Sequence, residues 1–198
     1  MLKVKTVNTK DELLQIYQLN QENLKSNLST ADQKQEGFVT WLYSIELLEK
    51  MHQLAPSIIV KDGNKVVGYA LTTLRETSAF HPDLKDMFQN LGRVQYKNRP
   101  LFSFHFYCMG QICVAKNYRS KGIVNNLYQK HKDIYSSQFD FILTEISTSN
   151  HRSLKAHEKI GFKTIYSHID EMDEWNVVVW DWKWARLIIR SCFPDCKS

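Results

Sequence analysis

The pattern of apolar and polar residues predicts a strand and then a helix at the start of the chain. Residues 2–7, LKVKTV, are predicted to form a short strand. Thr9 and Glu12 have the spacing of a capping box, so we expect a helix to begin here and to run to about Leu24. The side chains that should face the core from this helix are Leu13, Leu14, Tyr17 and Leu24.

A second amphipathic helix is predicted before Pro56, because helices usually end ahead of a proline. The polar residues 25–36, between the two helices, are predicted to form a loop. The apolar stripe of the second helix consists of Phe38, Trp41, Leu42, Ile45 and Leu48.

A β-hairpin should follow these helices. Residues 57–61 and 65–71 are rich in β-branched and apolar side chains, and residues 62–64 between them form an Asp-Gly turn signal. Further on, His81 and Pro82 are suited to open a short helix that Gly92 would end. The apolar side of this helix comprises Leu84, Met87, Phe88 and Leu91.

The centre of the chain combines a strand, a basic turn and a helix. Aromatic and β-branched residues at 102–114 predict a largely buried strand. After the turn at residues 116–122, apolar residues recur at helical spacing, while His131 falls on the polar side of this helix and should be solvated. The apolar stripe of the helix comprises Val124, Leu127, Tyr128, Ile134 and Tyr135.

Another strand is predicted at residues 139–146, directly after this helix. A strand, a crossover helix and a strand imply parallel pairing of the two strands with a right-handed connection. We expect a further helix at 153–160 and strands at 162–169 and 175–184, with the acidic residues 170–174 between these last two strands.

Length and composition fit one globular domain over residues 1–198, because 43% of the residues are hydrophobic. No apolar run approaches the ~20 residues of a membrane-spanning helix, and a secretory signal is absent, so we expect a cytoplasmic protein without a membrane partner. The net charge of +5 suits an anionic cofactor at least as well as nucleic acid. Free thiols and no metal site are expected, because neither a CxxC pair nor metal-ligand spacing with histidine occurs at Cys108, Cys113, Cys192 or Cys196.

The basic turn has the features of an anion-binding site. The first backbone N–H groups of a helix have no intrahelical partner and point outward with the positive end of the helix dipole. Gly122 lets a phosphate approach the backbone, and Lys116, Arg119 and Lys121 add positive charge. We interpret the turn as a diphosphate cradle; an ordinary strand-to-helix turn with solvated lysines is the alternative. The glycine motifs of P-loop and dinucleotide-binding proteins are absent.

Residues 143–162 carry the most specific motif. They read LTEISTSNHRSLKAHEKIGF and resemble the second signature of the GCN5-related N-acetyltransferases (GNAT), in which a strand precedes N-x-x-A-x-x-x-Y-E-K-x-G-F. Residues 119–124, RSKGIV, are similar to the Q/R-x-x-G-x-G/A loop of the same superfamily. The matching positions of the second motif are Asn150, Ser153, His157, Glu158, Lys159, Gly161 and Phe162.

This resemblance implies a fold class and a cosubstrate. The fold would be α+β in three layers: a mixed, mostly antiparallel central sheet with one splayed pair of parallel strands, and helices on both faces. Acetyl-CoA would lie where the parallel strands splay apart, without a metal. The backbone of Ile112, Cys113 and Val114 would pair with the pantetheine arm, and Asn150 and Ser153 would hold the arm from the other side. The alternative role of Asn150 is a helix N-cap. The amides that would hold the diphosphate belong to Arg119, Ser120, Lys121, Gly122, Ile123 and Val124.

Two departures from the superfamily pattern touch binding and chemistry. Val124 stands where the loop usually ends in glycine or alanine, and His157 replaces the tyrosine that often acts as general acid. An alkylamine has a pKa near ~10, so a base must remove its proton before attack on the thioester. Glu145 is the candidate base, with a structural carboxylate as the alternative. His157 is the candidate acid for the CoA thiolate, and activity should then decline at a pH set by an imidazole and not by a phenol. The alternative is a histidine that packs beside the pantetheine arm.

The resemblance leaves the acceptor open. The acceptor pocket would be built by residues 25–36 and 170–174. The four acidic residues of the second segment would favour a cationic amine; a solvated acidic loop is the alternative. We expect a small-molecule or peptide amine as acceptor, and a homodimer is possible. The alternative function is a catalytically silent acyl-CoA-binding module. Nucleic-acid binding would need a contiguous basic face, which the sequence does not show, so no nucleic-acid partner is expected.

Overall fold

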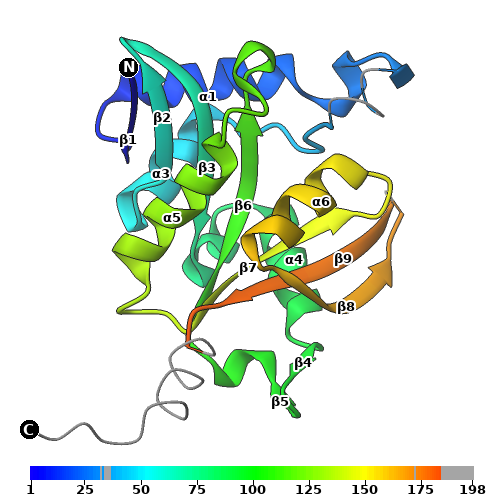
Figure 1. The fold of residues 1–198 in the computed structure, drawn as a ribbon. Coiled ribbons are helices and arrows are strands. Elements are labelled where there is room, and N and C mark those ends of the chain that lie inside the picture. Colours follow the sequence, from blue (N-terminus) through cyan, green and yellow to red (C-terminus); the bar gives the residue numbers. More distant parts are fainter. Residues whose placement is uncertain (32, 34–36, 172, 184–198) are drawn as a thin grey trace, which may run out of the picture.

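A seven-stranded sheet forms the centre of the protein (Figure 1). The computed structural model describes residues 1–31, 33, 37–171 and 173–183. Strand order across the large sheet is β1-β2-β3-β6-β7-β9-β8, and β4 and β5 form a separate pair. The strands are β1 (Leu2–Thr6), β2 (Ile58–Asp62), β3 (Lys65–Thr73), β4 (Gln95–Tyr96), β5 (Arg99–Pro100), β6 (Phe106–Val114), β7 (Phe141–Ser147), β8 (Lys163–Ile169) and β9 (Glu174–Asp181).

Helices cover both faces of this sheet (Figure 1). On one face, Leu127 and Tyr128 of α5 pack with Tyr107 of β6. On the other face, Leu48 of α3 packs with Tyr69 of β3. This arrangement confirms the predicted three-layer α+β fold. The helices are α1 (Lys10–Glu22), α3 (Ile45–Leu54), α4 (Pro82–Leu91), α5 (Ile123–Tyr135) and α6 (His151–Ile160), with short 3₁₀ turns η1 (Lys25–Asn27), η2 (Arg75–Ala79), η3 (Leu101–Ser103) and η4 (Lys116–Tyr118).

The parallel pair of strands separates after a short stretch of pairing. β6 and β7 are in parallel register only from Phe106 and Phe141 to Cys108 and Leu143. Beyond this point β6 continues alongside β3, with a register shift on the β3 side between Ala70 and Thr72, and β7 continues alongside β9. The two strands therefore splay as the resemblance implied, and β9 lies between β7 and β8, antiparallel to both.

The first helix begins where the sequence predicted, but it ends earlier than expected. The hydroxyl of Thr9 accepts a hydrogen bond from the N–H of Glu12 at 3.2 Å, as a capping box requires. The helix ends at Glu22, two residues before Leu24, and Leu14 is 39% exposed. The prediction that Leu14 faces the core was therefore wrong.

The predicted second helix begins only at Ile45. The segment before it, residues 38–43, is not helical because polar side chains hold its backbone. Asn20 and Gln111 both donate to the carbonyl oxygen of Trp41, at 3.1 and 2.8 Å. The segment expected to be a loop at residues 25–36 contains the 3₁₀ turn η1, and residues 32 and 34–36 lie outside the described residues.

The hairpin of β2 and β3 and the helix α4 agree with the sequence prediction. Gly63 adopts a left-handed φ of +57° in the hairpin turn, and α4 begins at Pro82 and buries Leu84, Phe88 and Leu91. The long central strand starts later than expected, because the aromatic run that opens it forms the turn η3.

The environment of His131 was also predicted wrongly. Its imidazole is fully buried between Tyr107, whose hydroxyl lies 3.0 Å from Nδ1, and the carbonyl of Ala70, 3.3 Å from Nε2. This burial lowers the pKa of His131 to about 3. Amphipathic spacing placed His131 on the polar side because histidine counts as polar, although the residue fills the core.

The last elements lie close to their predicted positions, but α6 begins at His151 and β9 ends at Asp181. Cys108 and Cys113 are free thiols, as expected. Trp184, Cys192 and Cys196 lie outside the described residues. None of the helices in the described part of the chain is long and apolar enough to cross a membrane.

Candidate active site

Two cavities open where β6 and β7 splay apart. The first, of about 530 Å³, lies between the amino terminus of α5 and the helix α6; we call it the basic cavity. The second, of about 540 Å³, lies among β7, α4 and the segment at 170–171; we call it the acidic cavity. The two cavities are neighbours, because they share as lining residues Phe38, Val39, Ile112, Asn150, Ser153 and His157.

The turn before α5 exposes its backbone to the basic cavity. Gly122 is the N-cap of α5 with a left-handed φ of +75°, and no side chain caps the helix. A Cβ atom added at Gly122 would meet nothing within 4 Å, so the peptide groups here are open to a ligand. Ser120 is also left-handed, with a φ of 61°. Successive amides of such a turn form a concave anion site together with the helix terminus.

The predicted cations of this turn have different roles. Arg119 donates from Nε to the carbonyl of Val114 at 3.0 Å and from Nη2 to Oδ1 of Asn23 at 2.5 Å, so its guanidinium ties the turn to β6 and α1. Lys116 and Lys121 are exposed, and Lys121 lies 5.0 Å from the centre of the Tyr118 ring. Of these three cations, only Arg119 lines the basic cavity.

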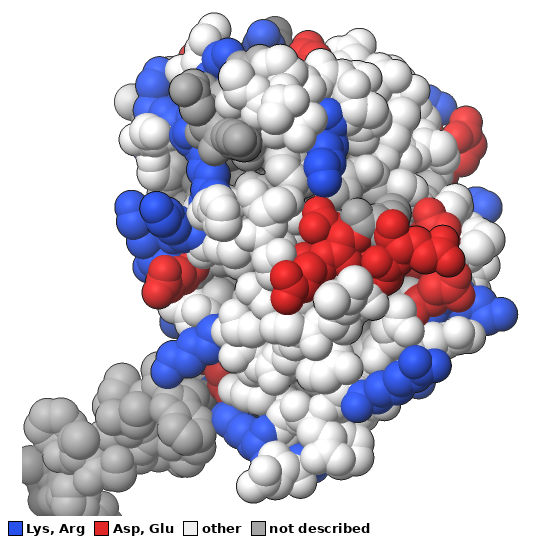
Figure 2. Space-filling view, turned by 90° about the vertical axis from the view of Figure 1, so that its right-hand side faces the viewer, with Lys and Arg blue, Asp and Glu red and all other residues white. Residues whose placement is uncertain are grey.

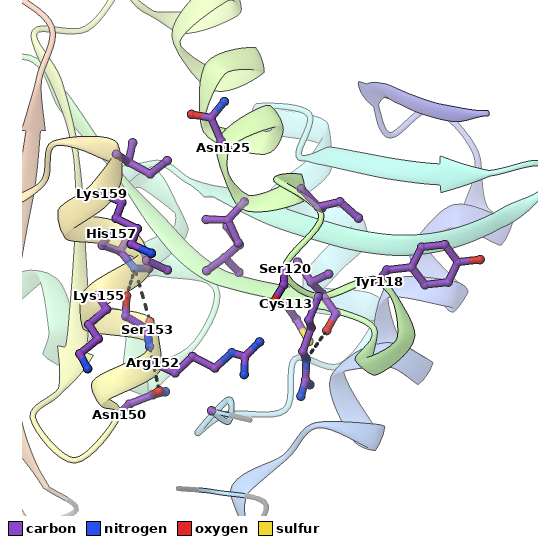
Figure 3. Close-up of a pocket in the computed structure, with 18 of the residues that line it drawn as sticks. Cys113, Tyr118, Ser120, Asn125, Asn150, Arg152, Ser153, Lys155, His157 and Lys159 are labelled. Atoms are coloured by element: carbon purple, nitrogen blue, oxygen red, sulfur yellow. Dashed lines mark hydrogen bonds between the residues drawn. The ribbon is translucent and has the colours of Figure 1, made fainter. Parts of the chain in front are cut away.

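Helix α6 supplies the other positive charges of the basic cavity. Arg152, Lys155 and Lys159 all line it. Figure 3 shows Arg152 extending from α6 toward the turn that carries Ser120. The spacing of three and four residues places these cations on one side of the helix. Such spacing is visible in the sequence, but only Lys159 was singled out there, as a position of the motif.

The strand residues expected to pair with pantetheine line the same cavity. Ile112, Cys113 and Val114 pair with β3 on one side, and no described strand pairs with them on the side facing β7. Burial raises the pKa of the Cys113 thiol to about 12, so this cysteine is a wall and not a nucleophile at neutral pH.

Asn150 and Ser153 lie at the start of α6. Oδ1 of Asn150 accepts a hydrogen bond from the N–H of Ser153 at 3.2 Å, which makes Asn150 the N-cap of the helix. Its Nδ2 donates to the carbonyl of Phe38 at 3.0 Å. The capping role is therefore present, and binding of a pantetheine arm by these residues stays a prediction.

His157 is enclosed by polar partners. Its exposed fraction is 2%, with Nε2 2.5 Å from the hydroxyl of Tyr128 and Nδ1 2.8 Å from the carbonyl oxygen of Ser153. A carbonyl only accepts, so Nδ1 carries the proton and Nε2 accepts from Tyr128. Burial lowers the pKa of His157 to about 4. The acid role of His157 stays a prediction, and this geometry favours the packing alternative.

Glu145 points into the acidic cavity beside a histidine that the sequence analysis did not consider. Oε1 of Glu145 lies 3.1 Å from Nε2 of His168, and each side chain is 18% exposed. Burial raises the pKa of Glu145, and the hydrogen bond and charge of His168 oppose this rise. His168 was missed because β8 has no functional motif and its position depends on β9 intervening between β7 and β8.

Carboxylates dominate the acidic cavity. Its described lining includes no lysine or arginine and five acidic residues. Figure 2 shows acidic side chains gathered in a band across this face of the molecule. Helix α4, whose role the sequence left open, contributes two of the five. The acidic lining residues are Asp83, Asp86, Glu145, Asp170 and Glu171. No group of three or more His, Cys, Asp or Glu side chains in the described part of the chain could hold a metal ion.

Comparison with solved structures returns acetyltransferases. The chain is similar to the ribosomal-protein-S18-alanine N-acetyltransferase of Escherichia coli, with 12% identity, a TM-score of 0.61, and coverage of 91% of this chain and 94% of that one. It is similar to yncA, a putative acetyltransferase of Salmonella typhimurium solved with acetyl-CoA, with 12% identity, a TM-score of 0.59, and coverage of 91% and 93%. An N-acetyltransferase of Staphylococcus aureus matches with 17% identity, a TM-score of 0.59, and coverage of 91% and 98%. These likenesses concern the fold.

The comparison at the level of sequence families identifies the chain. A search among curated proteins found no match. The acetyltransferase (GNAT) family matches residues 13–162, which include the splayed strands, the turn at the start of α5 and the whole motif at residues 143–162. The chain therefore belongs to the GNAT family of acetyltransferases.

Proposed function

We propose that this protein transfers the acetyl group of acetyl-CoA to a cationic primary amine. The observation that carries the proposal is the opposite charge of the two neighbouring cavities. Arg119, Arg152, Lys155 and Lys159 line the basic cavity, which has no carboxylate among its described lining residues. The acidic cavity has five carboxylates and no lysine or arginine among its described lining residues. An anionic cosubstrate and a cationic acceptor would thus approach from separate sides and meet at shared residues.

The basic cavity fits the chemistry of acetyl-CoA. Its open amides around Gly122 and the terminus of α5 suit a diphosphate, and the cations of α6 suit further phosphate oxygens. The edge of β6 at residues 112–114, which no described strand pairs on the side facing β7, suits the amides of a pantetheine arm. The structure of yncA with acetyl-CoA supports the same cosubstrate here by family likeness.

The reaction begins with deprotonation of the bound ammonium group. The neutral amine then attacks the thioester carbonyl carbon, a new C–N bond forms, and the C–S bond breaks. The ammonium loses one proton to a base, and the second proton that leaves the nitrogen neutralises the CoA thiolate. The products are an amide and CoA thiol. A primary amine needs this base because it is almost fully protonated near pH 7. We propose that the base lies in the acidic cavity, at Glu145 or the histidine hydrogen-bonded to it.

Thermal unfolding with and without acetyl-CoA tests the cosubstrate. At a hundredfold excess over the dissociation constant, we expect about 2.7 kcal/mol of added stability and a rise in Tm of roughly 5–10 °C. Gly122→Glu should abolish this rise because it places a carboxylate at the phosphate site. Gly63→Glu is the matched control, since Gly63 is also left-handed and also open, but lies in the β2–β3 turn outside both cavities.

A screen of amines with detection of free CoA tests the acceptor. Alkylamines, which are cationic at pH 7, should be acetylated faster than aromatic amines, which are neutral there. Equal turnover of the two classes would count against the cationic acceptor. Binding of acetyl-CoA without turnover of any amine would favour a silent acyl-CoA-binding module.

A further inference from the structure

We propose that His168 is the general base of the amine transfer and that Glu145 positions it. Nδ1 of His168 takes the proton of the acceptor ammonium, while Glu145 holds the ring and faces the positive charge that forms. This inference rests on the proposed function, because it assigns the base of that reaction. It differs from the expectation in the sequence analysis, where Glu145 itself was the base.

The topology of the sheet brings the two side chains together. Glu145 of β7 pairs with Val177 of β9, and Val177 pairs with Tyr166 of β8. His168 follows Tyr166 by two residues and therefore points to the same face of the sheet. The Glu145 carboxylate and the His168 ring meet at 3.1 Å across β9. The pair thus sits on strands and not on a loop, which favours a precise orientation.

Hydrogen bonding determines which nitrogen of His168 is available. An ionised carboxylate only accepts hydrogen bonds, so Nε2 of His168 carries the proton in the pair. The lone pair of the ring is then on Nδ1, which has no hydrogen bond to any residue in the described part of the chain. A carboxylate that orients a histidine in this way also stabilises the imidazolium form.

Both side chains face the space where an acceptor would bind. Glu145 and His168 line the acidic cavity together with Asn150, Ser153 and His157, which also line the basic cavity. Each has 18% of its side chain exposed, so water is largely excluded but a ligand in the cavity has access. A base on the wall of the acidic cavity lies beside the space where a cationic acceptor would bind.

The alternative, direct deprotonation by Glu145, fits this geometry less well. Oε1 of Glu145 is already engaged by His168. Burial raises the pKa of Glu145, the hydrogen bond and charge of His168 lower it, and the negative charge of Asp170 adds to the rise. The other titratable groups that line the cavity are the buried Tyr43 and Cys108, His157 of α6, Asp83 and Asp86 of α4, and Glu171.

The proton balance needs no further reactant. The ammonium gives one proton to Nδ1 of His168, and the amine lone pair forms the C–N bond. When the C–S bond breaks, the electron pair stays on sulfur, and the second proton of the new amide nitrogen converts the thiolate to CoA thiol. His168 then releases its proton to solvent.

Kinetics of His168→Asn and Glu145→Gln test the assignment, with n-butylamine as the first acceptor and the other alkylamines of the screen after it. His168→Asn should lower kcat at pH 7 by about 10²–10⁴-fold, the usual contribution of a general base. Its rate should recover as pH approaches the pKa of the amine, near ~10, because free amine then forms without a base. Glu145→Gln should lose less activity, and the acid limb of its kcat/KM profile should move to lower pH.

Two measurements separate this assignment from other failures. Both variants should keep the rise in Tm with acetyl-CoA, and His105→Asn, an exposed histidine outside both cavities, should keep full activity. The proposal is overturned if His168→Asn keeps the wild-type rate and pH profile while Glu145→Gln is inactive. Glu145 would then be the base. If the wild-type protein binds acetyl-CoA but acetylates no amine, the proposed function fails first and this role fails with it.

Discussion

At the scale of single residues, the hydrogen bond between Tyr128 and His157 bears on the role of the histidine in the second GNAT motif. Both residues are buried, and the hydroxyl of Tyr128 donates to Nε2 at 2.5 Å. The histidine stands where relatives carry a tyrosine, so the sequence suggested a substituted acid. In the structure both ring nitrogens of His157 are engaged and burial lowers its pKa to about 4, which favours the packing alternative, while the acid role stays a prediction.

This bond predicts a non-additive pair of substitutions. His157→Phe leaves the buried hydroxyl of Tyr128 without an acceptor, which should lower the free energy of unfolding by about 1–3 kcal/mol. Tyr128→Phe in the same chain removes that hydroxyl and should restore part of the loss, because a buried pair of apolar groups has no unsatisfied donor. Urea unfolding of the two single variants and the double variant measures the coupling; additive losses would mean that the hydrogen bond contributes nothing.

The sequence indicated which residues are candidates for the site more reliably than it indicated what surrounds them. Gly122 was singled out because glycine and basic residues at a strand-to-helix junction have a local physical meaning, and the structure makes it the left-handed N-cap of α5. Anion binding at this turn stays a prediction. The partners of Glu145 and His157 could not be found, because His168 and Tyr128 approach them only through the packing of distant elements.

At the scale of elements, the site depends on how β6 leaves β7. The register of β6 with β3 shifts within this stretch. Ala70 pairs with Ile112 and Thr72 pairs with Met109, so β6 contains one residue more than β3 between the two pairs. A bulge of this kind bends a strand and increases its twist. The bulge contains Gly110, and it lies just beyond the last parallel pair with β7, at Cys108.

Gly110→Ala should therefore disturb the bulge. A Cβ atom at Gly110 would lie 2.8 Å from the hydroxyl of Tyr43 and closer still to Oγ1 of Thr73. We expect a loss of about 1–3 kcal/mol in unfolding free energy, as for other overpacked cores, and weaker binding of acetyl-CoA. Thr73→Ala is the compensating change, since Oγ1 of Thr73 is buried without a hydrogen-bond partner in the described structure. If the double variant is no more stable than Gly110→Ala alone, the contact with Thr73 is not the cause.

The order of elements could be predicted from sequence, but one helix boundary could not. Apolar spacing at residues 38–48 mimics a helical stripe, yet residues 38–43 are not helical because Asn20 and Gln111 bind the carbonyl of Trp41. These hydrogen bonds come from α1 and β6, so no local pattern reveals them. The error matters because Phe38 and Val39 line both cavities.

At the scale of the whole molecule, charge is separated although the net charge is only +5. Composition could not predict this separation, because it arises when α4 and residues 170–171 meet beside β7 while α6 turns its cations toward α5. The stability of the whole molecule depends on charge in a second way, through histidines that are buried without charge. The pKa of His131 is lowered to about 3 and that of His157 to about 4, in both cases by burial.

These two histidines predict a loss of stability in mild acid. A group whose pKa is lowered by folding stabilises the protein fully above its unfolded pKa, here ~6.5, and loses that contribution as pH falls toward the folded pKa. Between pH 6 and 4.5 the unfolded chain binds the proton that folded His131 refuses, so this residue alone should make the unfolding free energy fall by about 1.4 kcal/mol per pH unit. Urea unfolding of His131→Phe should show a slope smaller by that amount. Tyr107→Phe removes the hydroxyl that binds His131 but keeps the imidazole, so it should lower stability and leave the slope intact. An unchanged slope in His131→Phe would mean that His131 is protonated in the folded protein, and that its burial does not keep it neutral.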